Sequence, residues 1–288
     1  MTDPVEERVR GPRLLGPPRN PRAREEGARG ALIAVISTLV FLAIAVSVIL
    51  TSEAWPAVQR QFFNPEKIAE AFPAIARGFW LDIRLFLLAE VLILIISLVI
   101  AMARSLRGPA FFPIRALAIT FIDLIRGIPI ILLILLLGFG VPALQLPGVP
   151  NSAIFWGLTA LITSYSAYTA EVYRAGIDSV HESQRMSARS LGLTQIQALR
   201  YVIVPQAIRN VIPALLNGFV SLQKDVALVF VLGIREGVRE ADIFAARTFN
   251  YSGYVTATFL FLLVSVPVAR FTDWYTDRDR RRKQAVSN

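Results

Sequence analysis

The chain has 288 residues, of which 55% are hydrophobic and 18% are charged, and it carries a net charge of +9. So apolar a composition excludes an ordinary soluble domain, and the absence of cysteine excludes disulfides and thiolate chemistry. One histidine is too few for a histidine-based metal site, and the basic residues cluster at the ends of hydrophobic blocks, which argues against a nucleic-acid-binding surface.

Apolar blocks of about 20 residues, the length that a helix needs to cross a bilayer core, predict an all-α polytopic membrane protein. Residues 1–30 are rich in Pro, Gly and Arg, a composition typical of disorder. Residues 31–77 are interpreted as a retained anchor helix followed by an outer loop. The six predicted spans cover about 31–51, 79–103, 116–141, 152–173, 210–234 and 254–272.

The distribution of Lys and Arg predicts how the chain is oriented in the membrane. Basic residues are concentrated in 1–30, 104–115, 174–209 and the segment after 270, which includes the tail 276–288. Because positively charged connections stay on the cytoplasmic side, both termini and the long connector are predicted to be cytoplasmic.

The long connector contains the signals of a helix–turn–helix. Residues 184–191 can form one short helix, and Gly192 suits its end because glycine readily adopts the left-handed conformation. Thr194 and Gln197 have the spacing of a capping box that starts a second helix, and Pro205 disfavours helix at the residue before it. The spacing alone fits either an amphipathic helix at the lipid headgroups or a rigid element that another protein binds.

Charged side chains inside the predicted spans are costly unless they pair or line a water-filled path. Asp123 and Arg126 are three residues apart and can form a structural pair or serve a pathway, and Pro129 loosens the helix beside them. Lys224 and Asp225 project about 100° apart on a regular helix and can face a central pathway or a partner subunit.

Other charges are interpreted as structural. Glu171 and Arg174 lie near the cytoplasmic end of their span and are predicted to form a pair that orients the following loop. Asp82 and Arg84 are predicted to be solvated near the outer surface. Glu90 lies deep in its span, and the sequence offers no account of it.

The stretch 184–205, QRMSARSLGLTQIQALRYVIVP, resembles the EAA loop of the permease subunits of binding-protein-dependent ABC importers. In that pattern E-A-A is followed by three residues, Gly, nine residues, an aliphatic residue, any residue, an aliphatic residue and Pro. The matching positions hold Ala188, Gly192, Val202, Val204 and Pro205, whereas Met186 and Ser187 replace the Glu and Ala of the pattern.

Three further stretches are similar to the polar amino-acid (histidine/glutamine-type) subfamily of these permeases. They are DLIRGIPIILL (123–133), AYTAEVYRAGIDSV (167–180) and NGFVSLQKDVALVFVLG (217–233). The resemblance covers about residues 78–275 and implies a five-helix permease core preceded by one extra helix. Departures that remove polar groups of the family pattern occur at Ile128, Leu133, Gly218, Val226 and Ala227.

The resemblance implies a mechanical role for the long connector. In this family the loop, here within 181–206, forms a coupling helix that inserts into a groove of a cytoplasmic ATPase dimer, and that ATPase binds ATP and Mg. The chain itself is then not an enzyme and holds no cofactor or metal. The resemblance assigns the coupling contacts to Arg185, Met186, Ala188, Arg189, Leu191, Gly192, Leu193 and Pro205. It assigns the substrate pathway to Arg126, Asn217, Lys224 and Asp225.

The same resemblance implies the setting in which the chain works. It places the protein in a bacterial inner membrane, beside a second permease subunit that is the same or related. An extracytoplasmic solute-binding protein delivers a small polar solute such as an amino acid. Membrane lipid is the remaining partner, and no nucleic acid is involved.

Two other classes of function are weighed against this interpretation. A stand-alone secondary transporter or channel needs internal symmetry such as inverted repeats, and the sequence shows no convincing repeat. A membrane-embedded enzyme is disfavoured because no nucleophile–base pair, phosphate-binding glycine loop or metal-ligand cluster is recognisable. Co-purification with an ATPase separates the importer from both alternatives.

Overall fold

The computed structural model describes residues 21–106 and 108–287, which form helices joined by turns, without a β-strand among them. It divides into two units, Met1–Val58 and Gln59–Asn288. In the first unit, α1 (Pro21–Leu50) contains one apolar stretch of membrane length, Leu32–Leu50. The expected disorder is not found at residues 21–30, which belong to α1, because Arg, Glu and Ala recur there and are strong helix formers. Residues 1–20 lie outside the described residues.

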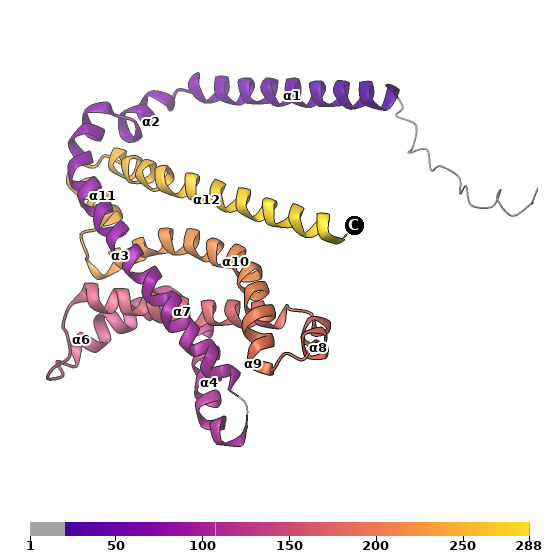
Figure 1. Cartoon of the computed structure of the whole chain (residues 1–288). Coiled ribbons are helices and arrows are strands. Elements are labelled where there is room, and N and C mark those ends of the chain that lie inside the picture. The colour runs from indigo at the N-terminus through magenta and orange to yellow at the C-terminus, as the bar shows by residue number, and fades with distance from the viewer. Residues whose placement is uncertain (1–20, 107, 288) are drawn as a thin grey trace, which may run out of the picture. The chain divides into compact units, whose positions relative to one another are not determined.

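The second unit contains α3 (Pro65–Ser105), the longest of the described helices, which follows the short α2 (Trp55–Phe62) (Figure 1). The side chain of Asn64 caps α3 by accepting a hydrogen bond from the backbone N–H of Lys67 at 3.2 Å. Pro65 suits the first helical position, where its missing N–H costs nothing. Residues 52–77, expected to be an outer loop, are therefore largely helical.

The third predicted span, 116–141, is broken rather than continuous. The helices Pro109–Gly127 and Ile130–Ala143 meet at an angle of 104°. Between them Ile128 is extended, with φ −96° and ψ 125°, as expected for a residue that precedes proline. This break separates α4 (Phe112–Gly127) from α5 (Ile130–Leu135), the π-helical turn η3 (Leu136–Gly140) and α6 (Val141–Ala143).

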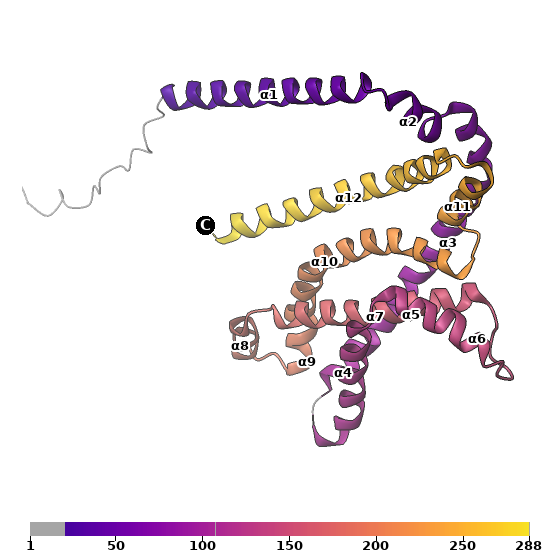
Figure 2. The same ribbon diagram turned by 180° about the vertical axis from the view of Figure 1, so that it is seen from behind.

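Helix α7 (Ala153–Asp178) is the centre of the second unit and packs against α3, α4, α5 and α10 (Figures 1 and 2). Four described helical stretches are long and apolar enough to cross a membrane, and the bent pair makes a fifth. The six predicted spans include α7, which is not among those five. Its sequence carries several Ser, Thr and Tyr residues, which are tolerated because neighbouring helices cover much of it.

The remaining elements run from the long connector to the C-terminus. They are α8 (Glu182–Ser190), α9 (Gln195–Ala198), the π-helical turn η4 (Leu199–Ile203), α10 (Val204–Asp225), the 3-10 helix η5 (Val226–Leu232), α11 (Gly237–Thr248) and α12 (Ser252–Ser287). The main core joins α3, α5, α7, α10 and η5. It includes Phe86, Ile93, Ile134, Leu161, Leu222 and Val229.

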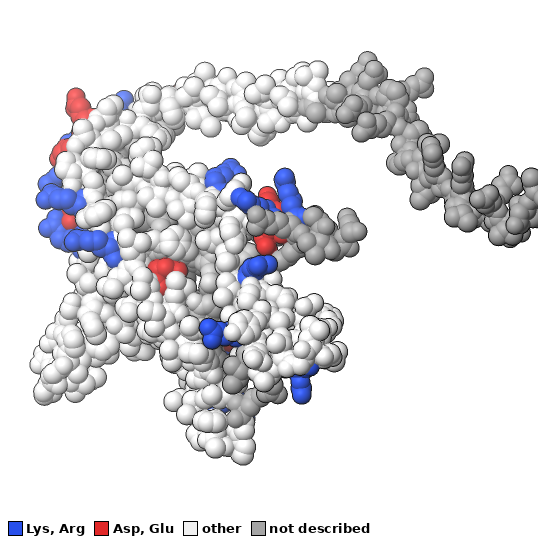
Figure 3. Space-filling view, in the orientation of Figure 1, with Lys and Arg blue, Asp and Glu red and all other residues white. Residues whose placement is uncertain are grey.

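Charged side chains are unevenly distributed over the surface. Lys and Arg gather over the end of the second unit that holds α11, and much of the other visible described surface is uncharged (Figure 3). An uncharged surface is the kind that faces lipid, since a charged side chain in hydrocarbon is costly.

The α3–α11 contact contains a buried acidic pair that the sequence did not predict. Asp82, expected to be solvated, is 2% exposed. Its Oδ2 atom accepts a hydrogen bond from the backbone N–H of Gly237 at 3.1 Å, and its carboxyl group lies against that of Glu236. Glu236 caps α11 by accepting from the N–H groups of Val238 and Arg239 at 2.8 and 2.6 Å. Burial raises the pKa of Glu236, although these two N–H groups oppose the shift.

We expect Asp82→Asn to stabilise the protein by about 1 kcal/mol, the size of one added hydrogen bond. The Oδ1 atom of Asp82 meets no hydrogen-bond donor among the described residues. An amide retains an acceptor for Gly237 and donates toward Glu236 without placing a second negative charge beside it. Thermal unfolding in detergent measures the effect, with Asp82→Leu as the control that leaves the Gly237 N–H unpaired and lowers stability. An Asp82→Asn protein less stable than the native one would contradict this account.

Candidate functional site

A cavity of about 610 Å³ lies between α3, the α4–α5 break, α7 and α10. Its volume falls in the range of small-molecule sites. The backbone of the break, Gly127–Pro129, forms part of its wall, as expected where irregular backbone in a membrane lines a cavity. Its polar and charged lining residues are Glu90, Arg126, Ser164, Tyr165, Tyr168, Thr169, Ser221 and Asp225.

Arg126 supplies the positive charge of the cavity. Its guanidinium group lies over the ring of Tyr168, 5.4 Å from the ring centre, and the Tyr168 hydroxyl donates to the Arg126 carbonyl oxygen at 3.2 Å. Among the described residues, no ion pair joins Arg126 to Asp123, so of the two alternatives predicted for them the structural pair is not formed. Because α4 ends at Gly127, Arg126 lies in the last turn and contacts α7 instead.

Asp225 supplies one of the negative charges. Its Oδ2 atom accepts a hydrogen bond from the hydroxyl of Tyr165 on α7 at 2.7 Å. The structure therefore brings two of the four predicted pathway residues, Arg126 and Asp225, to one cavity. Tyr165 contacts Asp225 and Tyr168 contacts Arg126. The sequence contained no signal that singled out these two tyrosines.

Lys224 and Asn217, the other two predicted pathway residues, do not line the cavity. Both are exposed on α10. They are seven residues apart, which places them on nearly the same helix face. Because a polar face of a membrane helix seldom contacts lipid, this face is suited to a partner subunit or to water.

Glu90 also lines the cavity, and no role for it could be predicted from the sequence. It is partly buried on α3. No hydrogen bond or ion pair to its side chain is found within the described part of the chain. Its position deep in an apolar helix was the only available signal.

The corner of the long connector has the predicted geometry. Gly192 has φ +81°, in the left-handed region. The Leu193 N–H donates to the Ala188 carbonyl at 3.2 Å and the Gly192 N–H to the Arg189 carbonyl at 3.0 Å, which together form a Schellman motif that ends α8. The glycine stop predicted from the sequence is confirmed.

The predicted capping box is also present. The Thr194 N–H donates to Oε1 of Gln197 at 2.9 Å, and the Gln197 N–H donates to Oγ1 of Thr194 at 3.3 Å. These reciprocal bonds start α9 immediately after the corner. Residues 188–197 therefore form a turn whose backbone is fixed at both helix ends.

The second loop helix differs from the prediction because it does not end before Pro205. It continues through η4 into α10, where Pro205 occupies the first turn. A proline has no N–H for the regular helical bond, and the π-helical turn at Leu199–Ile203 accommodates that loss without breaking the helix. The loop is consequently continuous with a membrane helix that borders the cavity.

The loop presents an uneven surface. Leu191, at the corner, is 83% exposed, and Met186 is also exposed, whereas Ala188 is buried. Arg189, Gly192 and Pro205 are exposed and Leu193 is half-buried. The side chain of Arg185 lies outside the described part of the structure. Leu199, Tyr201 and Val204 are exposed as well, and exposed apolar side chains gathered on one loop are typical of a protein contact.

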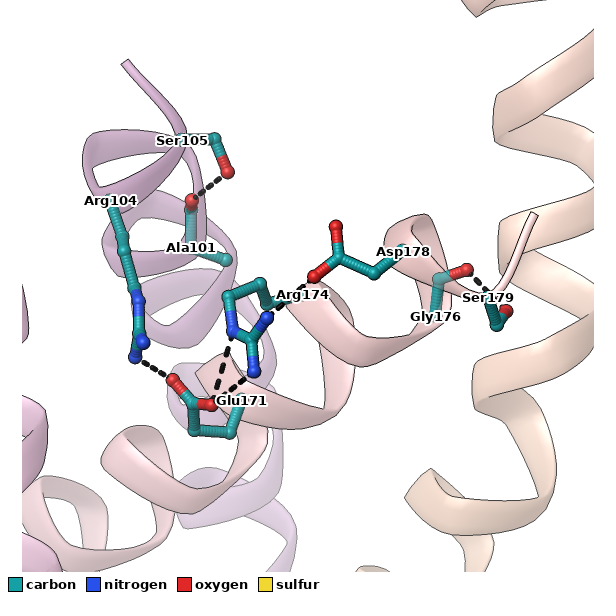
Figure 4. Close-up of polar contacts among 8 residues, drawn as sticks. All are labelled: Ala101, Arg104, Ser105, Glu171, Arg174, Gly176, Asp178 and Ser179. Carbon is teal, nitrogen blue, oxygen red and sulfur yellow. Dashed lines mark hydrogen bonds and ion pairs between the residues drawn. The ribbon is translucent and has the colours of Figure 1, made fainter. Parts of the chain in front are cut away.

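An ion-pair network fixes the end of α7 before the loop (Figure 4). The predicted pair is present, with Nη2 of Arg174 3.1 Å from Oε2 of Glu171. Arg104 of α3 also pairs with Glu171, and Nη1 of Arg174 lies 2.5 Å from Oδ2 of Asp178. The spacing of Arg174 and Asp178 could have indicated their pairing, whereas Arg104 comes from a distant part of the sequence.

The fold, the polar cavity and the rigid loop define a polytopic membrane protein of the transport class. Residues 108–281 match the family model described as "Binding-protein-dependent transport system inner membrane component". The chain belongs to this family, as its resemblance to the EAA-loop permeases predicted. It is the non-catalytic, multi-pass permease subunit of an ABC importer, forms the translocation pathway, and works with a separate ATPase and a binding protein.

Individual relatives agree with the family assignment. The chain is 32% identical over 190 residues to the probable amino-acid permease protein YxeN of Bacillus subtilis (strain 168), covering 65% of this chain and 82% of that protein. It is 35% identical over 188 residues to the probable glutamine ABC transporter permease protein GlnM of the same organism, covering 64% and 84%. A crystal structure of an amino acid ABC transporter with histidines superposes with a TM-score of 0.68 and 32% identity, covering 75% of this chain and 98% of that one.

Proposed function

We propose that the solute carried by this importer is an amino acid. An amino acid has a carboxylate and an ammonium group, and both need charged or hydrogen-bonding partners when they leave water. The observation that carries the proposal is that Arg126 and Asp225, of opposite charge, line one cavity beside the hydroxyl groups of Tyr165 and Tyr168. The names of the relatives, a probable amino-acid permease and a probable glutamine permease, support it.

The proposed coupling element is the loop 184–205. A structure that transmits force must be rigid, and the Schellman motif at Gly192 and the capping box at Thr194 fix the loop backbone. The exposed Leu191 and Met186 are suited to a groove of the ATPase, which we propose to be a cytoplasmic dimer that binds ATP and Mg. Movement of the loop would pass directly into α10, because η4 joins the two without interruption.

A second permease subunit, the same or related, is the proposed partner of α10. The exposed polar face that includes Asn217 and Lys224 would be costly against lipid, and a paired subunit or a shared aqueous path removes that cost. With the long connector on the ATPase side, both termini are proposed to be cytoplasmic. The domain limits at residues 78 and 275 stay predictions.

Reconstitution in vesicles tests this function. The complex of this chain with its co-purified ATPase is placed in vesicles with ATP inside and the binding protein outside, and uptake of labelled amino acids is followed. We expect uptake that requires both ATP and the binding protein. Uptake that proceeds without ATP down an ion gradient would support a stand-alone secondary transporter instead.

If Lys224 faces the aqueous path shared with the second subunit, we expect Lys224→Met to reduce uptake about tenfold, the effect of losing one charge-assisted contact with the solute, while recovery of the ATPase stays unchanged. The Lys224 side chain is exposed, and methionine retains its length and helix propensity without its charge. Uptake, ATPase recovery and thermal unfolding are measured together, with Lys224→Arg as the charge-preserving control. Native uptake by Lys224→Met would show that this charge has no part in the pathway.

A further inference from the structure

Glu90 is the charged residue of the cavity for which the family assignment supplies no role. It lies on α3 and faces the cavity together with Ile93 and Leu94 of the same helix. An ionised side chain within a membrane helix usually pairs or serves a ligand, because its desolvation is costly. Within the described residues, however, no cation or hydrogen-bond donor contacts the Glu90 carboxyl group.

The other charges of the cavity have partners from the protein. Asp225 accepts a hydrogen bond from Tyr165 at 2.7 Å, and Arg126 lies over Tyr168. Among the described residues, the lining therefore carries two carboxyl groups and one guanidinium group, and the carboxyl group of Glu90 is the one that contacts no partner there. A bound ligand that completes this set must bring more positive than negative charge.

We propose that the cavity selects amino acids with a cationic side chain, and that Glu90 is the residue that determines this specificity. The inference rests on the proposed amino-acid transport function. Arg126 would hold the α-carboxylate, Asp225 the α-ammonium group, and Glu90 the ammonium or guanidinium group of the side chain. Ile93, Leu94 and Phe219 also line the cavity and can cover an aliphatic stem.

A neutral amino acid would bind less well for the same reason. It supplies one carboxylate and one ammonium group, which leaves Glu90 desolvated and unpaired. An acidic amino acid would also bring its side-chain carboxylate close to Glu90. The order of affinity expected from the charges is therefore cationic, then neutral, then acidic.

Direct binding to the purified permease–ATPase complex tests this proposal, because the binding protein, which imposes its own selection, is left out. Labelled lysine, arginine, glutamine and glutamate are the probes. We expect the native complex to bind lysine or arginine at least about tenfold more tightly than glutamine, as for one charge-assisted hydrogen bond. A native complex that binds glutamine equally well would overturn the proposal.

Variants of Glu90 provide the second arm of the test. Glu90→Gln should remove the preference by weakening lysine binding about tenfold with glutamine binding unchanged, and Glu90→Asp should retain part of it. Glu66→Gln, an exposed change in the first turn of the same helix, should have no effect. If Glu90→Gln lost the same amount of binding affinity for all four probes, Glu90 would be a structural residue and the proposal would be overturned.

The outcomes also separate this inference from the function on which it rests. If vesicles accumulate neutral amino acids with ATP while the complex shows no preference for cationic ones, transport stands and the role of Glu90 is refuted. If no amino acid is accumulated with ATP, the amino-acid function fails, and the inference fails with it.

Discussion

Replacing Gly192 with valine is expected to reduce recovery of the ATPase with the permease, and ATP-driven uptake, by about tenfold or more. Gly192 has φ +81°, a conformation that costs a residue with a Cβ atom about 1–2 kcal/mol and a β-branched residue more. A Cβ atom there would meet nothing within 4 Å, so the effect comes from the backbone and not from a clash. The corner between α8 and α9 would change, and the exposed Leu191 would be displaced.

Gly192→Asn is the matched control, because asparagine tolerates the left-handed conformation. It should recover most of the ATPase and most of the uptake. Both variants should insert into the membrane normally, since the change lies in the loop and outside the spans. Normal ATPase recovery and uptake by Gly192→Val would count against the loop as the coupling element.

Gly176→Ala is expected to lower the free energy of unfolding by about 2 kcal/mol, within the usual range for an overpacked core. Gly176 is buried on α7, and a Cβ atom at this position would overlap Cγ1 of Val211 on α10 and lie 3.3 Å from the Ala207 carbonyl oxygen. Only a glycine permits this close approach of the two helices, so alanine must separate them.

Tryptophan fluorescence during thermal unfolding in detergent measures this loss. Val211→Ala, which removes the overlapping methyl group, should restore part of the stability when it is combined with Gly176→Ala. Gly30→Ala serves as the control, because a Cβ atom there meets nothing within 4 Å and alanine is the better helix former. If Gly176→Ala and Gly30→Ala were equally stable, the α7–α10 contact would not depend on glycine.

Local patterns in the sequence predicted local structure well. The Gly192 stop and the Thr194–Gln197 capping box are confirmed because each depends on bonds between residues a few positions apart. The Glu171–Arg174 pair is present for the same reason. The apolar blocks predicted the all-helical membrane fold, but the observed helices do not begin and end where the predicted spans do. Helix α3, for example, begins fourteen residues before the predicted span, because Asn64 caps it and Pro65 occupies its first position.

The failures occur where distant parts of the chain meet. Asp82 was predicted to be solvated, but it is buried against Gly237, which is 155 residues away in the sequence. Pro129 and Pro205 have the same local signal, yet one accompanies a sharp bend and the other lies in a continuous helix after a π turn. Packing of the surrounding helices decides whether the helix bends or continues at each proline, and that packing cannot be predicted from the local sequence.

Only part of the candidate site was predicted, because the sequence shows which residues are charged but not which way a helix turns them. Arg126 and Asp225 were identified because a charged side chain within a membrane span is costly unless it pairs or lines a water-filled path. The family resemblance also assigned Lys224 and Asn217 to the pathway, but neither lines the cavity, since the rotation of a helix about its axis is set by tertiary contacts. Glu90 was noticed without a role, because only the three-dimensional structure shows that it meets no partner among the described residues.

The most direct test of the central claim, that the loop couples this permease to an ATPase, is crosslinking from the exposed corner. The chain has no cysteine, so Leu191→Cys carries a single thiol for a short photoactivatable crosslinker in native membranes. We expect a covalent product with the ATPase from Leu191→Cys and none from Leu144→Cys, a residue 64% exposed at the end of α6 and remote from the loop in sequence. Absence of the Leu191→Cys product in membranes that retain ATP-driven uptake would contradict the claim.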